Sequence, residues 1–113
     1  MEDNILFSKA EELKNLLFER EEYKDYISKK EKIKEQSTIY TRVLEFEKRK
    51  FEMLMRNTCN GNEAMEYLKN EFMDILVKSE VQEYLNAEVI FAGLIKKVES
   101  IIFTDICKDV EII

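Results

Sequence analysis

The sequence contains no histidine, no proline and no tryptophan, and only two of its 113 residues are glycine. Histidine is the side chain that most often transfers protons near neutral pH, and glycine-rich loops cradle phosphates, so two common catalytic devices are missing. Proline and glycine are also the residues that most often interrupt helices. Their scarcity argues against an enzyme and favours a chain that is helical along most of its length.

Cysteine is scarce too, and the two that occur are Cys59 and Cys107. Neither belongs to a CxxC or CxxH motif, so they define neither a disulfide framework nor a zinc site. Cys59 lies in a probable turn and is expected to be an inert thiol. Each cysteine could supply at most one ligand to a cluster shared with other chains. We therefore predict no cofactor for the chain alone.

Long hydrophobic runs are also missing. The longest uncharged run near the C-terminus covers residues 89–95, whereas a membrane-spanning helix needs about 20 apolar residues. The acidic start, MEDNILFSKAEEL, shows neither the basic segment nor the apolar segment of a secretion signal. We expect a cytoplasmic protein with no membrane segment.

The charge balance is acidic, with 24 acidic and 18 basic residues and a net charge of -6. Such a chain is repelled by nucleic acid and by anionic membranes, so direct binding to nucleic acid is not expected. The lysines at positions 29, 30, 32 and 34 form a local basic cluster, which leaves weak RNA binding as an alternative. Lysines that complement a helix C-terminal dipole explain the cluster better.

The residues that are abundant indicate an all-α fold in a single domain, residues 1–113. Hydrophobic residues make up 45% of the chain and charged residues 37%, a balance typical of helices with charged surfaces. Apolar periodicity and turn residues, with the clearest turn at 57–62, delimit the helices. They are predicted over residues 4–18, 21–34, 38–56, 62–77 and 79–106.

The last predicted helix is the longest and the most apolar. Ser79 and Gln82 match the capping box, which fixes the start of the helix. A helix of this length would measure about 40 Å, so the fold of about five helices is expected to be elongated. Its apolar band covers more than half of the circumference, which is wider than one neighbouring helix requires.

Part of this band is therefore expected to contact either another chain or the first helix. If the contact is with another chain, the protein oligomerises through its long helices, as a homodimer or a larger homo-oligomer. Ala92 and Gly93 would allow a facing helix to approach closely. The predicted interface residues are Val81, Leu85, Ala92, Ile95, Val98 and Ile102.

Two segments resemble a known family. Residues 22–26, EYKDY, follow a first helix of the pattern ILFSKAEELKNLL, and residues 81–88 read VQEYLNAE. Both resemble the YlbF/YmcA family of small helical bacterial proteins, whose members carry a closely similar VQEYLxAE run at the start of their last long helix. The resemblance covers nearly the whole chain, and its motifs are structural rather than catalytic.

The resemblance implies an antiparallel helical bundle that associates through its long helices into dimers or larger assemblies and that regulates competence, sporulation or biofilm formation. It also implies a hetero-complex with YlbF-, YmcA- or YaaT-like proteins, which modulates ribonuclease Y-dependent RNA processing and is associated with iron-sulfur clusters. Cys107 is the residue that would match a cluster ligand. The leading hypothesis is a non-enzymatic regulator or scaffold that acts by helix association. The alternatives are a subunit that contributes Cys107 to a shared cluster, and a weak RNA-binding protein.

Overall fold

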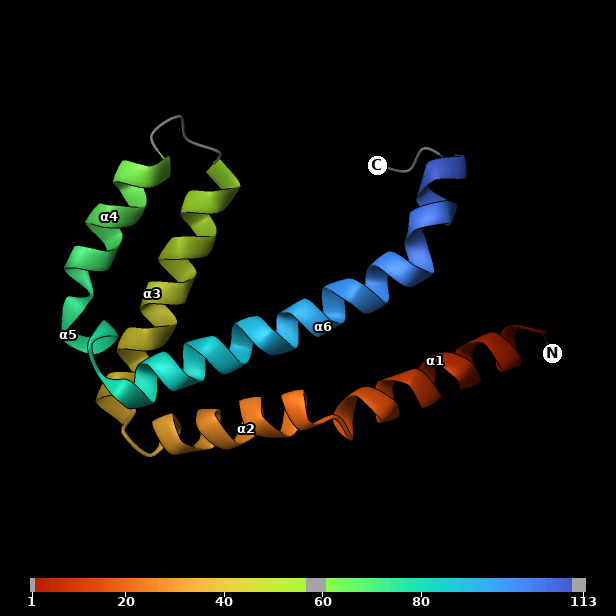
Figure 1. The fold of residues 1–113 in the computed structure, drawn as a ribbon, viewed down its shortest axis with the longest axis horizontal. Helices are drawn as coiled ribbons and strands as arrows, with labels where there is room; N and C mark the ends of the chain where they lie inside the picture. Colours follow the sequence, from red (N-terminus) through yellow and green to blue (C-terminus); the bar gives the residue numbers. More distant parts are fainter. Residues whose placement is uncertain (1, 57–60, 111–113) are drawn as a thin grey trace. The chain divides into compact units, whose positions relative to one another are not determined.

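The computed structural model describes the backbone of residues 2–56 and 61–110, and the side chains of residues 4–56, 62–104 and 106. Within these residues the chain folds into helices without strands, which confirms the all-α class and the long C-terminal helix (Figure 1). The helices are α1 (Glu2–Phe18), α2 (Glu21–Lys34), α3 (Ser37–Arg56), α4 (Gly61–Glu71), α5 (Met73–Leu76) and α6 (Ser79–Val110).

The segment predicted as one helix over residues 62–77 forms two helices, α4 and α5, that are separated at Phe72. The backbone of Phe72 departs from helical geometry, with φ of -104° and ψ of 19°, and its side chain is fully buried. The next turn is tighter than an α-helix, because the amide of Ile75 donates to the carbonyl of Phe72 at 3.1 Å. Tertiary packing of an aromatic ring, without proline or glycine, accounts for the break.

The helix α6 begins at the predicted residue but with a different cap. The amide of Gln82 donates to the carbonyl of Lys78 at 3.1 Å, so Lys78, and not Ser79, carries the carbonyl that accepts the first bond of the helix. The side chain of Gln82 turns back and donates from Nε2 to the carbonyl of Leu76 at 2.9 Å. The Gln82 side chain therefore bonds to the preceding turn and not to Ser79 as the expected capping box requires.

The contacts divide the chain into two compact units. One, which we call the terminal unit, joins Met1–Ile27 to Asn86–Ile113, and the other, the central unit, comprises Ser28–Leu85. The prediction of a single domain over residues 1–113 stays a prediction.

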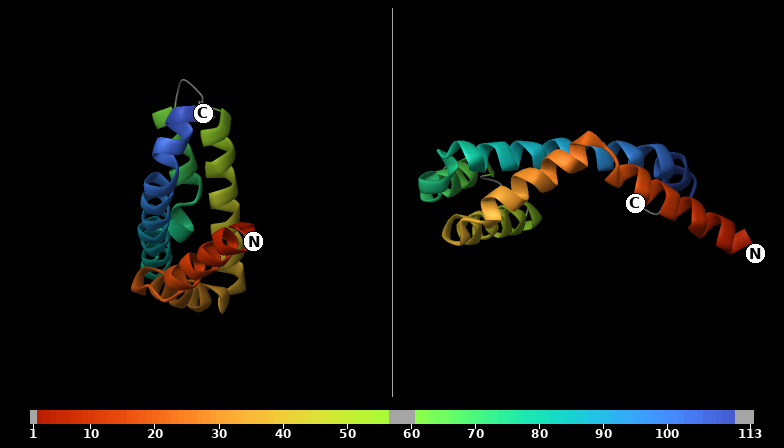
Figure 2. Two further views of the ribbon diagram at one scale, coloured as in Figure 1. Left: turned by 90° about the vertical axis from the view of Figure 1, so that its right-hand side faces the viewer. Right: turned by 90° about the horizontal axis from the view of Figure 1, so that it is seen from below.

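In the central unit, α3 and α4 lie side by side and run in opposite directions (Figures 1 and 2). The side chains that these helices and their neighbours bury are large and apolar. The buried residues of this unit are Ile33, Val43, Phe46, Leu68, Phe72, Ile75, Val81 and Tyr84.

In the terminal unit, four aromatic rings connect the end of α1 and the start of α2 to α6. The ring of Tyr23 lies 4.8 Å from that of Phe18 and 5.2 Å from that of Phe91, and Tyr26 stacks on Phe91 at 5.7 Å. Aromatic pairs at such distances add to the stability that apolar burial provides. This cluster fixes α6 against the chain that follows α1.

Candidate functional site

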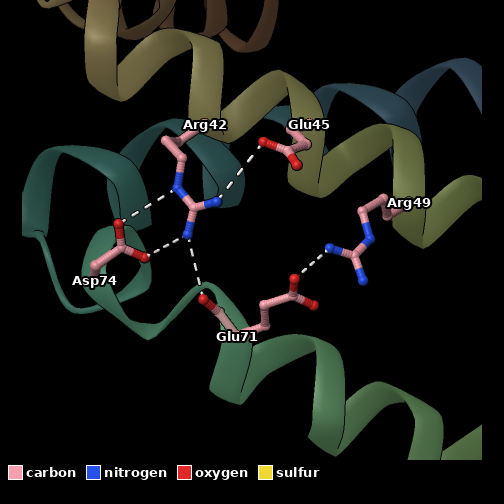
Figure 3. A network of polar contacts seen from close by, with 5 residues as sticks. All are labelled: Arg42, Glu45, Arg49, Glu71 and Asp74. Carbon is pink, nitrogen blue, oxygen red and sulfur yellow. Dashed lines mark hydrogen bonds and ion pairs between the residues drawn. The ribbon is translucent and has the colours of Figure 1, made fainter.

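The most extensive charge network lies in the central unit and links α3 to α4 and α5 (Figure 3). The guanidinium of Arg42 donates from Nη2 to Asp74 Oδ1 at 2.9 Å and to the carbonyl of Glu71 at 3.2 Å. Arg49 donates from Nη1 to Glu71 Oε1 at 2.6 Å. Arg42 also lies 3.7 Å from Glu45 Oε2, one turn along α3. Every charge in the network therefore has an oppositely charged neighbour.

The ring of Phe72 lies beneath the same two arginines. The guanidinium carbons of Arg42 and Arg49 are 4.2 Å and 5.4 Å from its centroid, distances at which a cation is attracted to an aromatic face. Phe72 also contacts Phe46 edge to face, with the two ring centroids 5.5 Å apart. The network thus covers Phe72, the residue that separates α4 from α5.

The electrostatics of these groups do not favour proton transfer. Hydrogen bonds from Arg42 and Arg49 hold the pKa values of Asp74 and Glu71 below their ordinary range. The same bonds raise the pKa values of the two arginines. In the terminal unit, the hydrogen bond from Arg20 likewise lowers the pKa of Glu22. Each shift moves the pKa of a group further from neutral pH, whereas a general acid or base needs a pKa near the working pH.

A groove of about 350 Å³ lies between α3 and α4. It mixes acidic, basic and apolar side chains, and Arg49, which could attract an anion there, is already bonded to Glu71. The groove offers no single charge or shape that selects a ligand. It is lined by Arg49, Glu52, Met53, Arg56, Ala64, Tyr67 and Leu68.

A second groove, of about 320 Å³, lies between α1 and α6 within the terminal unit and is mainly apolar. The basic side chains of Arg20 and Lys97 stand beside six leucine, valine and isoleucine side chains. Its lining residues are Leu13, Leu16, Leu17, Arg20, Leu94, Lys97, Val98 and Ile101. One side of α6 thus faces α1.

The structure places the six predicted interface residues of α6 in three different environments. Val81 is fully buried and belongs to the core of the central unit. Leu85, Ile95 and Val98 are half-buried, whereas Ala92 and Ile102 are exposed. They do not form one continuous exposed stripe.

Two exposed aromatic and aliphatic residues of α6 were absent from the predicted band. Phe103 and Ile106 are 49% and 50% exposed, comparable with Val89 at 64% on the same helix. The missed signal is their spacing, because Phe103 lies eleven residues and Ile106 fourteen residues after Ala92, as a helical stripe requires. A Cβ added at Gly93 would meet no atom within 4 Å, so a second helix has room at this point.

The remaining predicted residues are the two cysteines and the lysines of the basic cluster. Cys59 lies outside the described residues. The backbone of Cys107 belongs to α6, while its side chain lies outside the described part. Among the lysines of the basic cluster, Lys32 and Lys34 are exposed near the end of α2, in agreement with a dipole role.

Within the described side chains, no group of three histidine, cysteine, aspartate or glutamate residues could hold a metal ion. The described helices include none that is both long and apolar enough to cross a membrane. The observations define a small all-α protein in which ion pairs link α3 to α4 and α5 and whose last helix exposes several large apolar side chains.

The chain belongs to the YlbF/YmcA family. The model of this family, described as "Control of competence regulator ComK, YlbF/YmcA", matches residues 6–106 and so includes both segments on which the resemblance rests. This match confirms the resemblance, and the description assigns the family a regulatory role. Searches of curated proteins and of solved structures found no match.

Proposed function

We propose that this protein is a non-enzymatic regulator or scaffold that acts by association of its helices, first of all with a second copy of itself. The observation that carries this proposal is the exposed apolar surface of α6. This surface persists although α6 already packs against other elements of its own chain. Exposed large apolar side chains on a helix that already packs within its own chain commonly mark a protein interaction site.

The exposed apolar side chains of α6 indicate how much surface a partner helix could cover. Six large apolar side chains of α6 are between 39% and 76% exposed, and each would bury on the order of 100 Å² against a partner. Of these, Val89, Phe103 and Ile106 fall on one side of α6 and would together bury roughly 300 Å² against one partner helix, so other contacts would have to supply the rest of the roughly 800 Å² per partner of a standard protein interface. The six are Val89, Ile90, Ile101, Ile102, Phe103 and Ile106.

Substitution of Ala92 by aspartate tests the proposal. Ala92 is exposed on α6, and a carboxylate there would be buried without a partner if another helix packs closely against it, which costs several kcal/mol. Sedimentation velocity should show the wild type as a dimer or larger species and Ala92→Asp as a monomer. The matched control is Ala10→Asp, an exposed alanine on α1, which should keep the wild-type mass. A monomeric wild type, or equal masses for both variants, would refute self-association through this face.

The finer assignments of the family resemblance are part of the same proposal. We infer that self-associated copies bind YlbF-, YmcA- or YaaT-like partners in the cytoplasm and so influence RNA processing without contacting RNA directly. Co-purification of a tagged chain with each candidate partner, compared with Ala92→Asp, checks this inference. Retention of a partner by the monomeric variant would show that partner binding does not need self-association.

The alternative of a shared iron-sulfur cluster depends on Cys107. Clusters are commonly held by four cysteine thiolates, and the whole chain contains two cysteines, so one chain cannot complete such a ligand set. A partner would have to supply the others. Iron analysis of an anaerobically purified complex with wild-type or Cys107→Ser chains tests the residue, and equal iron contents would remove Cys107 from the site.

A further inference from the structure

We propose that two copies pair through antiparallel α6 helices, with Lys96 of each copy opposite Glu99 of the other. This inference rests on the self-association proposed above and adds the direction and the register of the contact. It depends on one exposed stripe of α6, which we call the α6 seam. The seam consists of Val89, Ala92, Lys96, Glu99, Phe103 and Ile106.

The seam has the spacing of a coiled coil. Its successive positions alternate between three and four residues apart, the pattern that keeps one helix face against a partner over several turns. All six side chains are exposed. A face with this spacing can be covered by one other helix where α6 is straight, and a partner that reaches the last positions of the seam has to follow the bend near the C-terminal end of α6 (Figure 1).

The seam lies on the side of α6 that its own chain leaves open. The groove between α1 and α6 is lined on α6 by Leu94, Val98 and Ile101. At 3.6 residues per turn, these positions fall on the opposite side of the helix from Ala92, Glu99 and Ile106. α1 therefore does not compete for the seam within the terminal unit.

The two charges at the centre of the seam have no ion-pair partner among the described residues. Lys96 and Glu99 stand three residues apart on one helix, yet they form no bridge with each other, unlike Lys9 with Glu12 or Lys14 with Glu11 on α1. Charges in the middle of an apolar stripe destabilise a complex in which the partner places no opposite charge beside them. A polar residue at such a position commonly fixes the register of paired helices.

The positions of these charges distinguish the two directions of pairing. In a parallel, in-register pair, Lys96 would face Lys96 and Glu99 would face Glu99 of the second copy, so like charges would meet twice. In an antiparallel pair centred between residues 97 and 98, Lys96 faces Glu99 twice by symmetry. Only the antiparallel arrangement brings opposite charges together.

The apolar positions fit the same register. Ala92 then lies opposite Phe103 of the second copy, and Val89 lies opposite Ile106. Each layer combines a smaller with a larger side chain, which allows two helices to keep an even separation. One register thus satisfies the charges and the sizes together.

Charge reversal tests the pairing. Lys96→Glu alone places four carboxylates at the centre of the seam, and Glu99→Lys alone places four ammonium groups there. Each variant should dissociate at least about 10-fold more readily than the wild type in sedimentation equilibrium, and this loss should shrink at high salt. An equimolar mixture of the two variants restores both opposite-charge pairs and should recover wild-type association, as should the double variant Lys96→Glu/Glu99→Lys.

Disulfide trapping tests the register in the full chain, in a Cys59→Ser/Cys107→Ser background. A mixture of Ala92→Cys chains with Phe103→Cys chains should form a mixed disulfide, because the two positions face each other. Ala92→Cys chains alone should not cross-link, since the two copies of residue 92 would be offset by eleven residues, about 16 Å. Cross-linking of Ala92→Cys with itself would instead show parallel pairing and overturn the proposal.

The outcomes separate this inference from the proposed function. If the wild type is monomeric, self-association itself is wrong, and the seam is wrong with it. If the wild type associates but the single charge variants behave as the wild type does, or their mixture fails to recover association, the seam is wrong and self-association stands. Recovery in the mixture together with the mixed disulfide would establish the antiparallel register.

Discussion

Replacement of Phe72 by alanine should strongly destabilise the central unit. Phe72 is fully buried between the Phe46 ring and the guanidinium of Arg42. Removal of a buried phenylalanine ring typically costs about 3 to 5 kcal/mol, because transfer energy is lost and a cavity remains. Domains of this size are stable by about 5 to 15 kcal/mol in total, so the variant should lose a large part of its stability.

Urea denaturation followed by circular dichroism measures this loss. The midpoint should fall while the slope stays near the wild-type value, and the thermal midpoint should fall by more than about 10 °C. Phe72→Leu separates packing from aromatic contacts, because it fills much of the cavity but removes the edge-to-face and cation-π contacts. We expect it to cost about 1 to 2 kcal/mol.

The matched control is Tyr67→Ala, an aromatic residue of the same helical pair that is 71% exposed. A surface substitution of this kind changes stability by about 0.5 kcal/mol or less. If Phe72→Ala were no more destabilising than Tyr67→Ala, the position of Phe72 at the centre of the central unit would be wrong. A loss for Phe72→Leu as large as that for Phe72→Ala would show that the aromatic contacts, and not the filled volume, dominate.

Two further predictions concern other parts of the fold. Arg42 lowers the pKa of Asp74, so the stabilisation from this ion pair should be complete above the unfolded pKa of about 4 and should be lost as the pH falls through the lower folded pKa. The difference in urea midpoint between wild type and Arg42→Met should therefore be constant from pH 7 to pH 5 and shrink toward pH 3. A difference that does not change with pH would contradict the pairing. Gly93→Ala should raise stability by up to about 1 kcal/mol, since alanine is the better helix former and its Cβ meets no atom, and a lower thermal midpoint would show that this space is filled.

Local features of the fold could be predicted from the sequence because they depend on neighbouring residues. The bounds of α2 and the start of α6 follow from turn residues and apolar periodicity, and the structure confirms both. The break at Phe72 could not be predicted, because it arises from packing against α3. The bonds between Arg42 and Asp74 join residues 32 positions apart, which no local pattern reveals.

The candidate site shows the same division. Periodicity identified an apolar band on α6 that is wider than one neighbour needs, and the structure shows apolar side chains exposed there. Periodicity alone could not indicate which part of the band is covered. Val81 was predicted at the interface and lies in the core, whereas Phe103 and Ile106 were missed and are exposed.

The division of the chain into two units also determines the order in which they can form during synthesis. The central unit uses only Ser28–Leu85, whereas the terminal unit needs Asn86–Ile113 to meet the first helix. At translation rates of about 5 to 20 residues per second, the central unit can fold while the last segment is still being made. The apolar residues of α1 therefore stay exposed for a time on the order of seconds before α6 is complete. The nascent chain is vulnerable to aggregation in that interval.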